Sequence, residues 1–101
     1  MKKIYTILGI DFELDIANIF DELSSIDFYK TIDEQLMVLD EDLLLLTFKS
    51  GYIVDVGWYP AFEKDGRFVI SEIIDGNWNE PAYQCAAGWD RDELINKRNN
   101  I

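Results

Sequence analysis

The fold is decided by Leu43-Leu-Leu-Leu-Thr-Phe-Lys-Ser-Gly-Tyr-Ile-Val-Asp-Val56, in which two short apolar runs flank a Lys-Ser-Gly break. Two more apolar runs follow, Arg67-Phe-Val-Ile-Ser-Glu-Ile-Ile74 and Ala82-Tyr-Gln-Cys-Ala86. Short runs rich in β-branched and aromatic residues, separated by Gly, Pro and Asp-Gly, are typical of strands joined by turns. We therefore expect an antiparallel β-meander of four strands, at 43–48, 52–57, 67–74 and 82–87.

Toward the N-terminus, apolar residues recur at helical spacing between Phe12 and Leu23. An apolar stripe with the acids largely outside it predicts an N-terminal helix over about 12–24. The stretch before this helix fits either a strand or the helix's own first turns. The third predicted strand alternates imperfectly, so both faces of the sheet should be partly covered, with the helices on one of them.

Toward the C-terminus, a second helix is predicted over about 91–99. Asp90 is placed to be its N-cap, and Glu93 stands three residues on, which is the spacing of a capping box. Lys97 and Arg98 fall in the last turn, where the helix dipole favours cations. The sheet and the two helices together define an α+β fold.

The composition fits one folded domain over residues 1–101. Hydrophobic residues make up 49% of the chain, whereas disordered chains are poorer in them. The chain has no histidine and one cysteine, which excludes Ser-His-Asp triads, Cys-His dyads, histidine zinc sites and internal disulfides. We expect no catalytic residue, no cofactor and no metal, and hence a protein that is not an enzyme.

The net charge is −11, from 20 acidic and 9 basic residues. Most of it lies in residues 11–42, which hold eleven acids and a single base, Lys30. This charge argues against nucleic acid or an anionic membrane as partner, because both require positive charge on the protein. The acidic segment is either a solubilising surface or a patch that steers a cationic partner.

The first ten residues contain two lysines and then an apolar stretch, as signal peptides do. Only seven residues separate Lys3 from Asp11, and no small-residue cleavage site follows, so we expect this segment to belong to the folded protein. No apolar run approaches the roughly 20 residues of a membrane-spanning helix. With a lone thiol, these features predict a cytoplasmic location.

Three features of the sequence resemble chemical sites, but none of them meets the requirements of such a site. Asp75-Gly-Asn-Trp-Asn79 matches the first positions of a calcium loop, but the required glycine is Glu80 and the required glutamate is Ala86. Cys85 has no histidine or lysine near it in sequence, which favours a small buried residue. A carboxylate pair able to hydrolyse glycosides carries no weight, because some pair is always close when acids are this frequent.

Aromatic residues are concentrated in two connections of the meander. Gly57-Trp-Tyr-Pro-Ala-Phe62 places three rings in the connection at 57–66, and Trp78 lies in the connection at 75–81. Such rings beside Asp, Glu and Asn are either anchors for a partner or lids over the ends of the sheet. Successive turns of a meander lie at opposite ends, so the two loops form one pocket only if one of them folds back.

Four segments resemble small bacterial immunity proteins of contact-dependent growth inhibition and related polymorphic-toxin systems. They are Ile53-Val-Asp-Val-Gly-Trp-Tyr-Pro60, Asp65-Gly-x-Phe-Val-Ile70, Gly76-Asn-Trp-Asn-Glu-Pro81 and Asp92-Glu-Leu-Ile95. The resemblance covers about residues 43–98. It implies a bacterial protein that binds the C-terminal domain of a toxin, often a nuclease, and blocks it. It implies no contact residues, because these families diverge most where they meet the toxin.

Charge and resemblance lead to the hypothesis of an immunity protein that neutralises a cognate toxin domain, a cationic nuclease, by direct protein–protein contact. Two alternatives stay open: a nucleic-acid-mimicking inhibitor of a host enzyme, of the anti-restriction or anti-CRISPR type, and a small acidic enzyme. Under the leading hypothesis, the acidic third of the chain and one aromatic loop contact the partner. The expected contact residues are Asp21, Glu22, Asp33, Glu34, Trp58, Tyr59, Glu63, Asp65 and Trp78.

Overall fold

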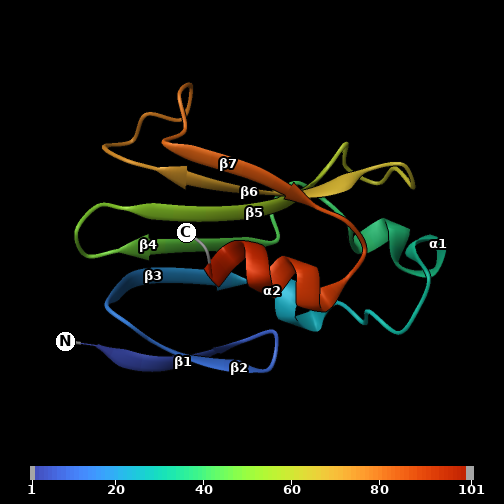
Figure 1. Ribbon diagram of the computed structural model, residues 1–101, viewed down its shortest axis with the longest axis horizontal. Coiled ribbons are helices and arrows are strands. Elements are labelled where there is room, and N and C mark those ends of the chain that lie inside the picture. The colour runs from blue at the N-terminus through green and yellow to red at the C-terminus, as the bar shows by residue number, and fades with distance from the viewer. Residues whose placement is uncertain (1, 100–101) are drawn as a thin grey trace.

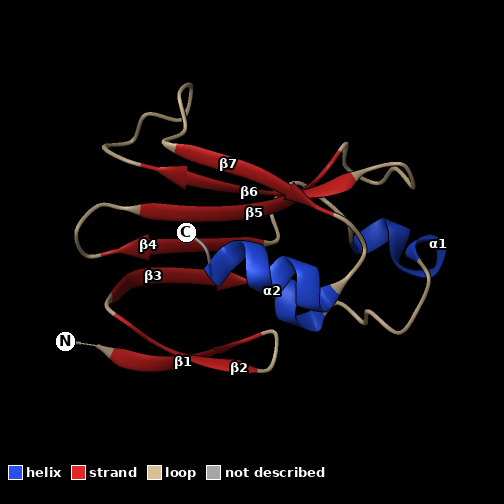
Figure 2. Ribbon diagram, in the orientation of Figure 1, coloured by secondary structure: helices blue, strands red, loops and turns tan. Residues whose placement is uncertain are grey.

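Strands dominate the computed structural model, which describes the backbone of residues 2–99 and the side chains of residues 2–96. Five strands form one antiparallel sheet in sequence order, and two N-terminal strands form a separate hairpin (Figures 1 and 2). The strands are β1 (Lys3–Ile7), β2 (Ile10–Leu14), β3 (Ile16–Asp21), β4 (Leu44–Phe48), β5 (Ile53–Tyr59), β6 (Arg67–Ile73) and β7 (Tyr83–Ala87). The helices are α1 (Ile32–Gln35) and α2 (Arg91–Asn99), with 3-10 turns at Leu23–Ser25 and Leu36–Val38. The fold is therefore α+β.

The predicted meander corresponds to β4 to β7, whose ends lie within two residues of the predicted ones. Each neighbouring pair of these strands is antiparallel, and none of the three pairings contains a register shift. Val56, for example, lies opposite Leu44 on β4 and opposite Ile70 on β6, and Ile70 lies opposite Cys85 on β7. The main difference is at the end of β5, which extends to Tyr59. Trp58 and Tyr59 therefore lie in a strand, and not in the predicted connection at 57–66.

The predicted N-terminal helix over 12–24 is wrong, because this region forms β2, β3 and the 3-10 turn that follows. A β-bulge in β3 explains the misleading spacing. Its pairing with β4 shifts between Ile16 opposite Phe48 and Asn18 opposite Thr47, so that one residue of β3 is extra. Ile16 and Ile19 thereby share a face although they are three apart, which imitates a helical period.

The predicted C-terminal helix is confirmed with its bounds, Arg91–Asn99. Asp90 caps it, since its Oδ1 accepts the backbone N–H groups of Asp92 at 2.8 Å and Glu93 at 3.1 Å. The capping box does not close on Asp90, because Glu93 Oε1 accepts the backbone N–H of Gly88 instead, at 3.3 Å. The predicted dipole role of Lys97 and Arg98 concerns side chains outside the described ones.

One face of the five-stranded sheet, which we call the closed face, is covered by α2 and carries the main hydrophobic core (Figure 1). The rings of Trp58, Phe68, Trp89 and Phe28 pack there with centroids 5.0–5.9 Å apart. Trp58 and Phe68 have no exposed surface. The Trp58 indole N–H is also satisfied, because it donates to the carbonyl of Glu63 at 2.7 Å. Burial and hydrogen bonding together fix these rings in the core.

The β1–β2 hairpin is tied to the rest of the protein through its turn. Leu8 and Gly9 both have positive φ, 55° and 78°, as a two-residue type I′ turn requires. Leu8 is buried in the core, and its N–H donates to Ser24 Oγ at 3.0 Å. The Arg91 guanidinium donates to the Leu8 carbonyl from Nε, at 3.0 Å, and from Nη2. The turn is thus held by the 3-10 turn after β3 and by the first residue of α2.

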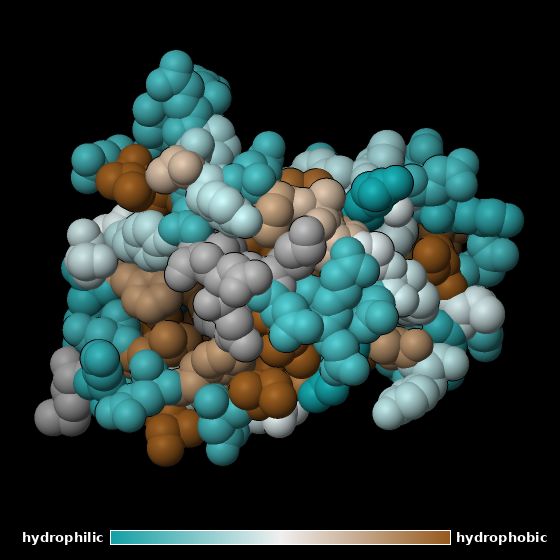
Figure 3. Space-filling view, viewed as in Figure 1, coloured by the Kyte–Doolittle hydropathy of each residue, from teal (hydrophilic) through white to brown (hydrophobic). Residues whose placement is uncertain are grey.

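The part of the acidic segment that lies between β3 and β4 forms the end of the molecule that carries α1 (Figure 1). Mostly hydrophilic residues cover this end (Figure 3). Among them stand exposed apolar side chains, with Tyr29 fully exposed and Met37 82% exposed. Within the described residues, no helix is long and apolar enough to cross a bilayer.

Candidate functional site

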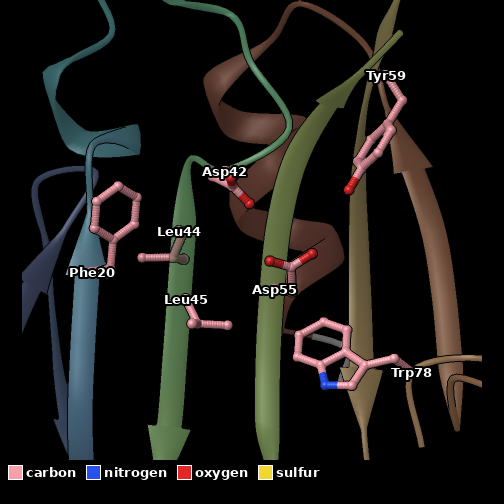
Figure 4. Close-up of a pocket in the computed structure, with 7 residues that line it drawn as sticks. All are labelled: Phe20, Asp42, Leu44, Leu45, Asp55, Tyr59 and Trp78. Atoms are coloured by element: carbon pink, nitrogen blue, oxygen red, sulfur yellow. The ribbon is translucent and has the colours of Figure 1, made fainter. Parts of the chain in front are cut away.

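The sheet face that points away from α2, which we call the open face, holds a pocket. A row of directly paired residues runs across it, with Phe20 opposite Leu45, Leu45 opposite Asp55, and Asp55 opposite Ser71. Paired residues share a face, so these side chains point the same way. The open-face pocket has a volume of about 470 Å³ and is lined by Phe20, Asp42, Leu44, Leu45, Asp55, Tyr59 and Trp78 (Figure 4).

Gly57 makes room for one wall of this pocket. A Cβ atom placed on Gly57 would lie 2.9 Å from Cε2 of Tyr59 and 2.1 Å from the backbone carbonyl oxygen of Glu41. Only glycine accommodates the ring on one strand position and the neighbouring backbone together. The Tyr59 ring therefore lies along β5 and directs its hydroxyl toward the pocket (Figure 4).

Trp78 forms another wall, because the loop between β6 and β7 brings it back over the sheet. Asp75 and Gly76 have positive φ, 55° and 70°, and the Trp78 N–H donates to the Gly76 carbonyl at 3.0 Å. The indole lines the same pocket as Tyr59, although Tyr59 ends strand β5 and Trp78 lies in the loop between β6 and β7 (Figure 4). It remains 51% exposed, so its surface is available to a partner.

Asp55 supplies charge inside the pocket. Partial burial, and secondly the negative charge of Asp42, raise the pKa of the Asp55 carboxyl to about 6. The pKa of the Tyr59 hydroxyl is also raised, first by burial and then by the charges of Asp55, Glu41 and Asp42. The two carboxyls and the hydroxyl point into the same space (Figure 4). No lysine or arginine is among the lining residues, so the pocket walls do not neutralise this charge.

This arrangement suits a cation better than it suits a reaction. Aromatic faces attract cations, and carboxylates pair with them. The lining contains no serine, cysteine or histidine that an adjacent base would activate. Across the described part of the chain, no three acidic or cysteine side chains are grouped so as to hold a metal ion.

The expected aromatic contacts divide between the two faces. Tyr59 and Trp78 line the open-face pocket. Trp58 is wrong as a contact residue, because strand alternation turns it into the closed-face core when it turns Tyr59 outward. Glu63 and Asp65 are exposed in the connection after β5, outside the pocket lining.

The expected acidic contacts also lie outside the pocket lining. The Asp21 carboxylate accepts the backbone N–H of Ser24 at 2.9 Å and its hydroxyl at 2.6 Å, while Glu22 is exposed. Asp33 is exposed on α1. Glu34 closes a capping box with Thr31, and the N–H bond from Thr31 holds the pKa of the Glu34 carboxyl below its usual value. Asp21 and Glu34 therefore have local structural roles.

Five pocket residues were not expected from the sequence: Phe20, Asp42, Leu44, Leu45 and Asp55. Phe20 belongs to the apolar stripe that suggested a helix, which concealed its position on a sheet. Asp55 did carry a signal, since it is a carboxylate within the apolar run Ile53-Val-Asp-Val56. A charged residue inside a buried strand requires either a partner or a function.

Comparison with known protein families, with curated proteins and with solved structures finds no match to this chain. Its resemblance to immunity proteins stays a prediction. The function is therefore argued from the geometry and charge of the open face.

Proposed function

We propose that this protein binds and neutralises a cationic partner protein, as an immunity protein neutralises a toxin domain. The open-face pocket carries the proposal: two carboxyls stand among three aromatic rings with no basic residue in the lining. A partly buried carboxylate without a cation costs stability, and such groups are concentrated at functional sites. A cation supplied by a partner would offset that cost.

The charge of the whole chain supports a cationic partner. Residues 11–42 hold eleven acids, and the last of them, Asp42, lines the pocket. The acidic segment and the pocket are therefore continuous. Long-range charge steers an approaching partner, whereas affinity depends on a few desolvated anchors, here Tyr59 and Trp78.

A nuclease domain is the partner class that fits this charge best. Nucleases bind phosphates through lysine and arginine, so an acidic protein can occupy the same surface. The resemblance of residues 43–98 to immunity proteins of contact-dependent growth inhibition supports the same class. On this proposal the protein acts in the bacterial cytoplasm, without a cofactor and without catalysis.

The direct test is to purify the tagged protein from its native cells at low salt and to identify what remains bound. We expect a basic protein domain in equimolar amount, whose activity the complex suppresses. A large host nuclease that DNA displaces would instead indicate a nucleic-acid mimic. The proposal would be contradicted if the protein is purified without a bound partner and also fails to bind basic nuclease domains of the same organism.

Association with that domain should depend strongly on salt. Steered pairs associate at up to about 10⁸ M⁻¹s⁻¹ at low salt, and the Debye length shrinks to about 8 Å at 0.15 M. We expect the on-rate to fall steeply from about 20 to about 500 mM salt, with a smaller change in the off-rate. Stopped-flow or surface-based kinetics measure both rates. A salt-independent on-rate would remove the steering role of the acidic segment.

A further inference from the structure

The open-face pocket has dimensions suited to a single side chain. Its volume of about 470 Å³ lies within the range of pockets that take small-molecule ligands, so it has room for a long side chain. Phe20, Tyr59 and Trp78 provide rings around it, and Asp42 and Asp55 direct carboxyls into it (Figure 4). One projecting side chain of a protein partner is small enough to enter this space.

Among cationic side chains, arginine matches the lining best. Its guanidinium is planar, stacks on aromatic faces and carries five N–H donors, which is enough to serve two carboxylates. Its methylene stem covers apolar surface such as that of Leu45. A lysine ammonium is compact and more strongly hydrated, so it gains less from the rings.

We propose that the open-face pocket accepts one arginine side chain of the partner protein, with its guanidinium between Tyr59 and Trp78 and paired with Asp42 and Asp55. This inference rests on the proposed function, because that function defines the partner as a cationic protein. Charge complementarity supports it within the described residues. Their ion pairs join Lys49 to Asp15 and Arg91 to Asp92, and neither uses a pocket carboxylate.

The titration of Asp55 provides a signature for such a pair. The titratable groups that face Asp55 are Asp42 and Tyr59, with Glu41 beside the Tyr59 ring. A bound guanidinium favours the charged carboxylate, so it lowers the Asp55 pKa from about 6. By linkage, arginine binding strengthens as the pH rises through that value.

A small arginine analogue tests the pocket without the partner. N-acetyl-arginine amide is titrated into ¹⁵N-labelled protein, and the indole N–H signals of the three tryptophans are followed. The Trp78 signal should shift and saturate at millimolar concentrations, on the order of the weakest measurable affinities. Trp58 and Trp89, whose indole N–H groups donate to backbone carbonyls, serve as internal controls. The citrulline analogue, which has the same shape without charge, should leave Trp78 unshifted, and the lysine analogue should shift it less.

Two variants assign the effect to the pocket. Asp55→Asn should weaken binding of the arginine analogue by about tenfold, because truncating one side of a charge pair has at least that cost. Asp92→Asn removes the same charge from α2, behind the sheet, and should change binding less than about twofold, as exposed pairs do. Unchanged Trp58 and Trp89 signals show that both variants remain folded. An equal response to the citrulline analogue, or no effect of Asp55→Asn, would overturn the proposal.

The same variants separate this inference from the proposed function. If the basic partner binds Asp55→Asn as tightly as the unaltered protein, the arginine assignment is wrong while the proposed function stands. If the arginine analogue binds as expected and no basic partner exists, the proposed function is wrong while the pocket's chemistry stands.

Discussion

The two faces of the sheet differ most clearly along β5, where alternate residues belong to different chemistries. Val56 and Trp58 point into the closed face, where both side chains are buried in the core. Asp55 and Tyr59 point to the open face, which keeps a carboxyl and a hydroxyl with raised pKa values next to a pocket. A spacing of one residue thus separates stabilisation from recognition. Substitutions at neighbouring positions of β5 should therefore act on different measurements. Three variants on β5 and one at the cap of α2 test this.

The largest effect is expected on the closed face. Trp58→Ala should lower the free energy of unfolding by about 3–5 kcal/mol, since it opens a cavity in the core and leaves the Glu63 carbonyl without its donor. Urea denaturation measures this loss. The folded fraction should still bind the partner normally. A loss below about 1 kcal/mol would mean that the aromatic cluster is not the core that its burial indicates.

The neighbouring residue should show the reverse pattern. Tyr59→Ala removes a ring that is 37% exposed and lines the open-face pocket. We expect binding to weaken by about 2 kcal/mol, as at interface hot spots, with a smaller change in unfolding. Binding kinetics and thermal unfolding, measured on one preparation, show whether the substitution affects binding or stability. If the variant unfolds easily but binds the partner normally, Tyr59 contributes to the stability of the core and not to binding.

Asp55→Asn should stabilise the protein while it weakens recognition. The Asp55 carboxyl binds its proton more tightly in the folded state, so its charge penalty is small below about pH 4 and complete above about pH 6. Because the carboxyl is partly exposed, the variant should gain only about 1.5 kcal/mol at pH 7. The gain should vanish near pH 4, which urea denaturation across this pH range checks. A gain independent of pH would point to a cause other than titration.

The smallest effect is expected far from both functions of β5. Asp90→Ala removes the N-cap of α2 and should lower stability by about 1 kcal/mol. Partner binding should not change while the variant remains folded, which calorimetry of the complex measures. Full stability with lost binding would assign Asp90 to the interface instead of the cap.

Local chemistry made the meander and α2 predictable from the sequence. Strands β4 to β7 are separated by glycine, proline and Asp-Gly turns, and Asp90 marks the start of α2 by a short-range cap. The N-terminal strands were not predictable in this way, because the β3 bulge gives Ile16 and Ile19 a helical spacing. Only the pairing with β4, which is distant in sequence, resolves that ambiguity.

The open-face pocket was predictable only in its parts. Tyr59 and Trp78 were expected as anchors on the basis of residue type, but their meeting depends on the folded-back β6–β7 loop. Phe20 and Asp42 join them from segments more than ten residues before β5, through the register of β3 and β4. Residue spacing within one segment does not predict such cross-strand neighbours. Trp58 illustrates the same limit, because its placement depends on where β5 ends.

The bonds from Arg91 to Leu8 join residues that are 83 positions apart, so α2 secures a hairpin that is synthesised well before it. A nascent chain emerges from the ribosome N-terminus first. The β1–β2 hairpin therefore lacks the hydrogen bonds from Arg91 until that residue has been synthesised. Loss of the segment from Arg91 onward would leave the carbonyl of the buried Leu8 without its hydrogen-bond donor. Slow amide exchange in the hairpin would thus report on the integrity of α2.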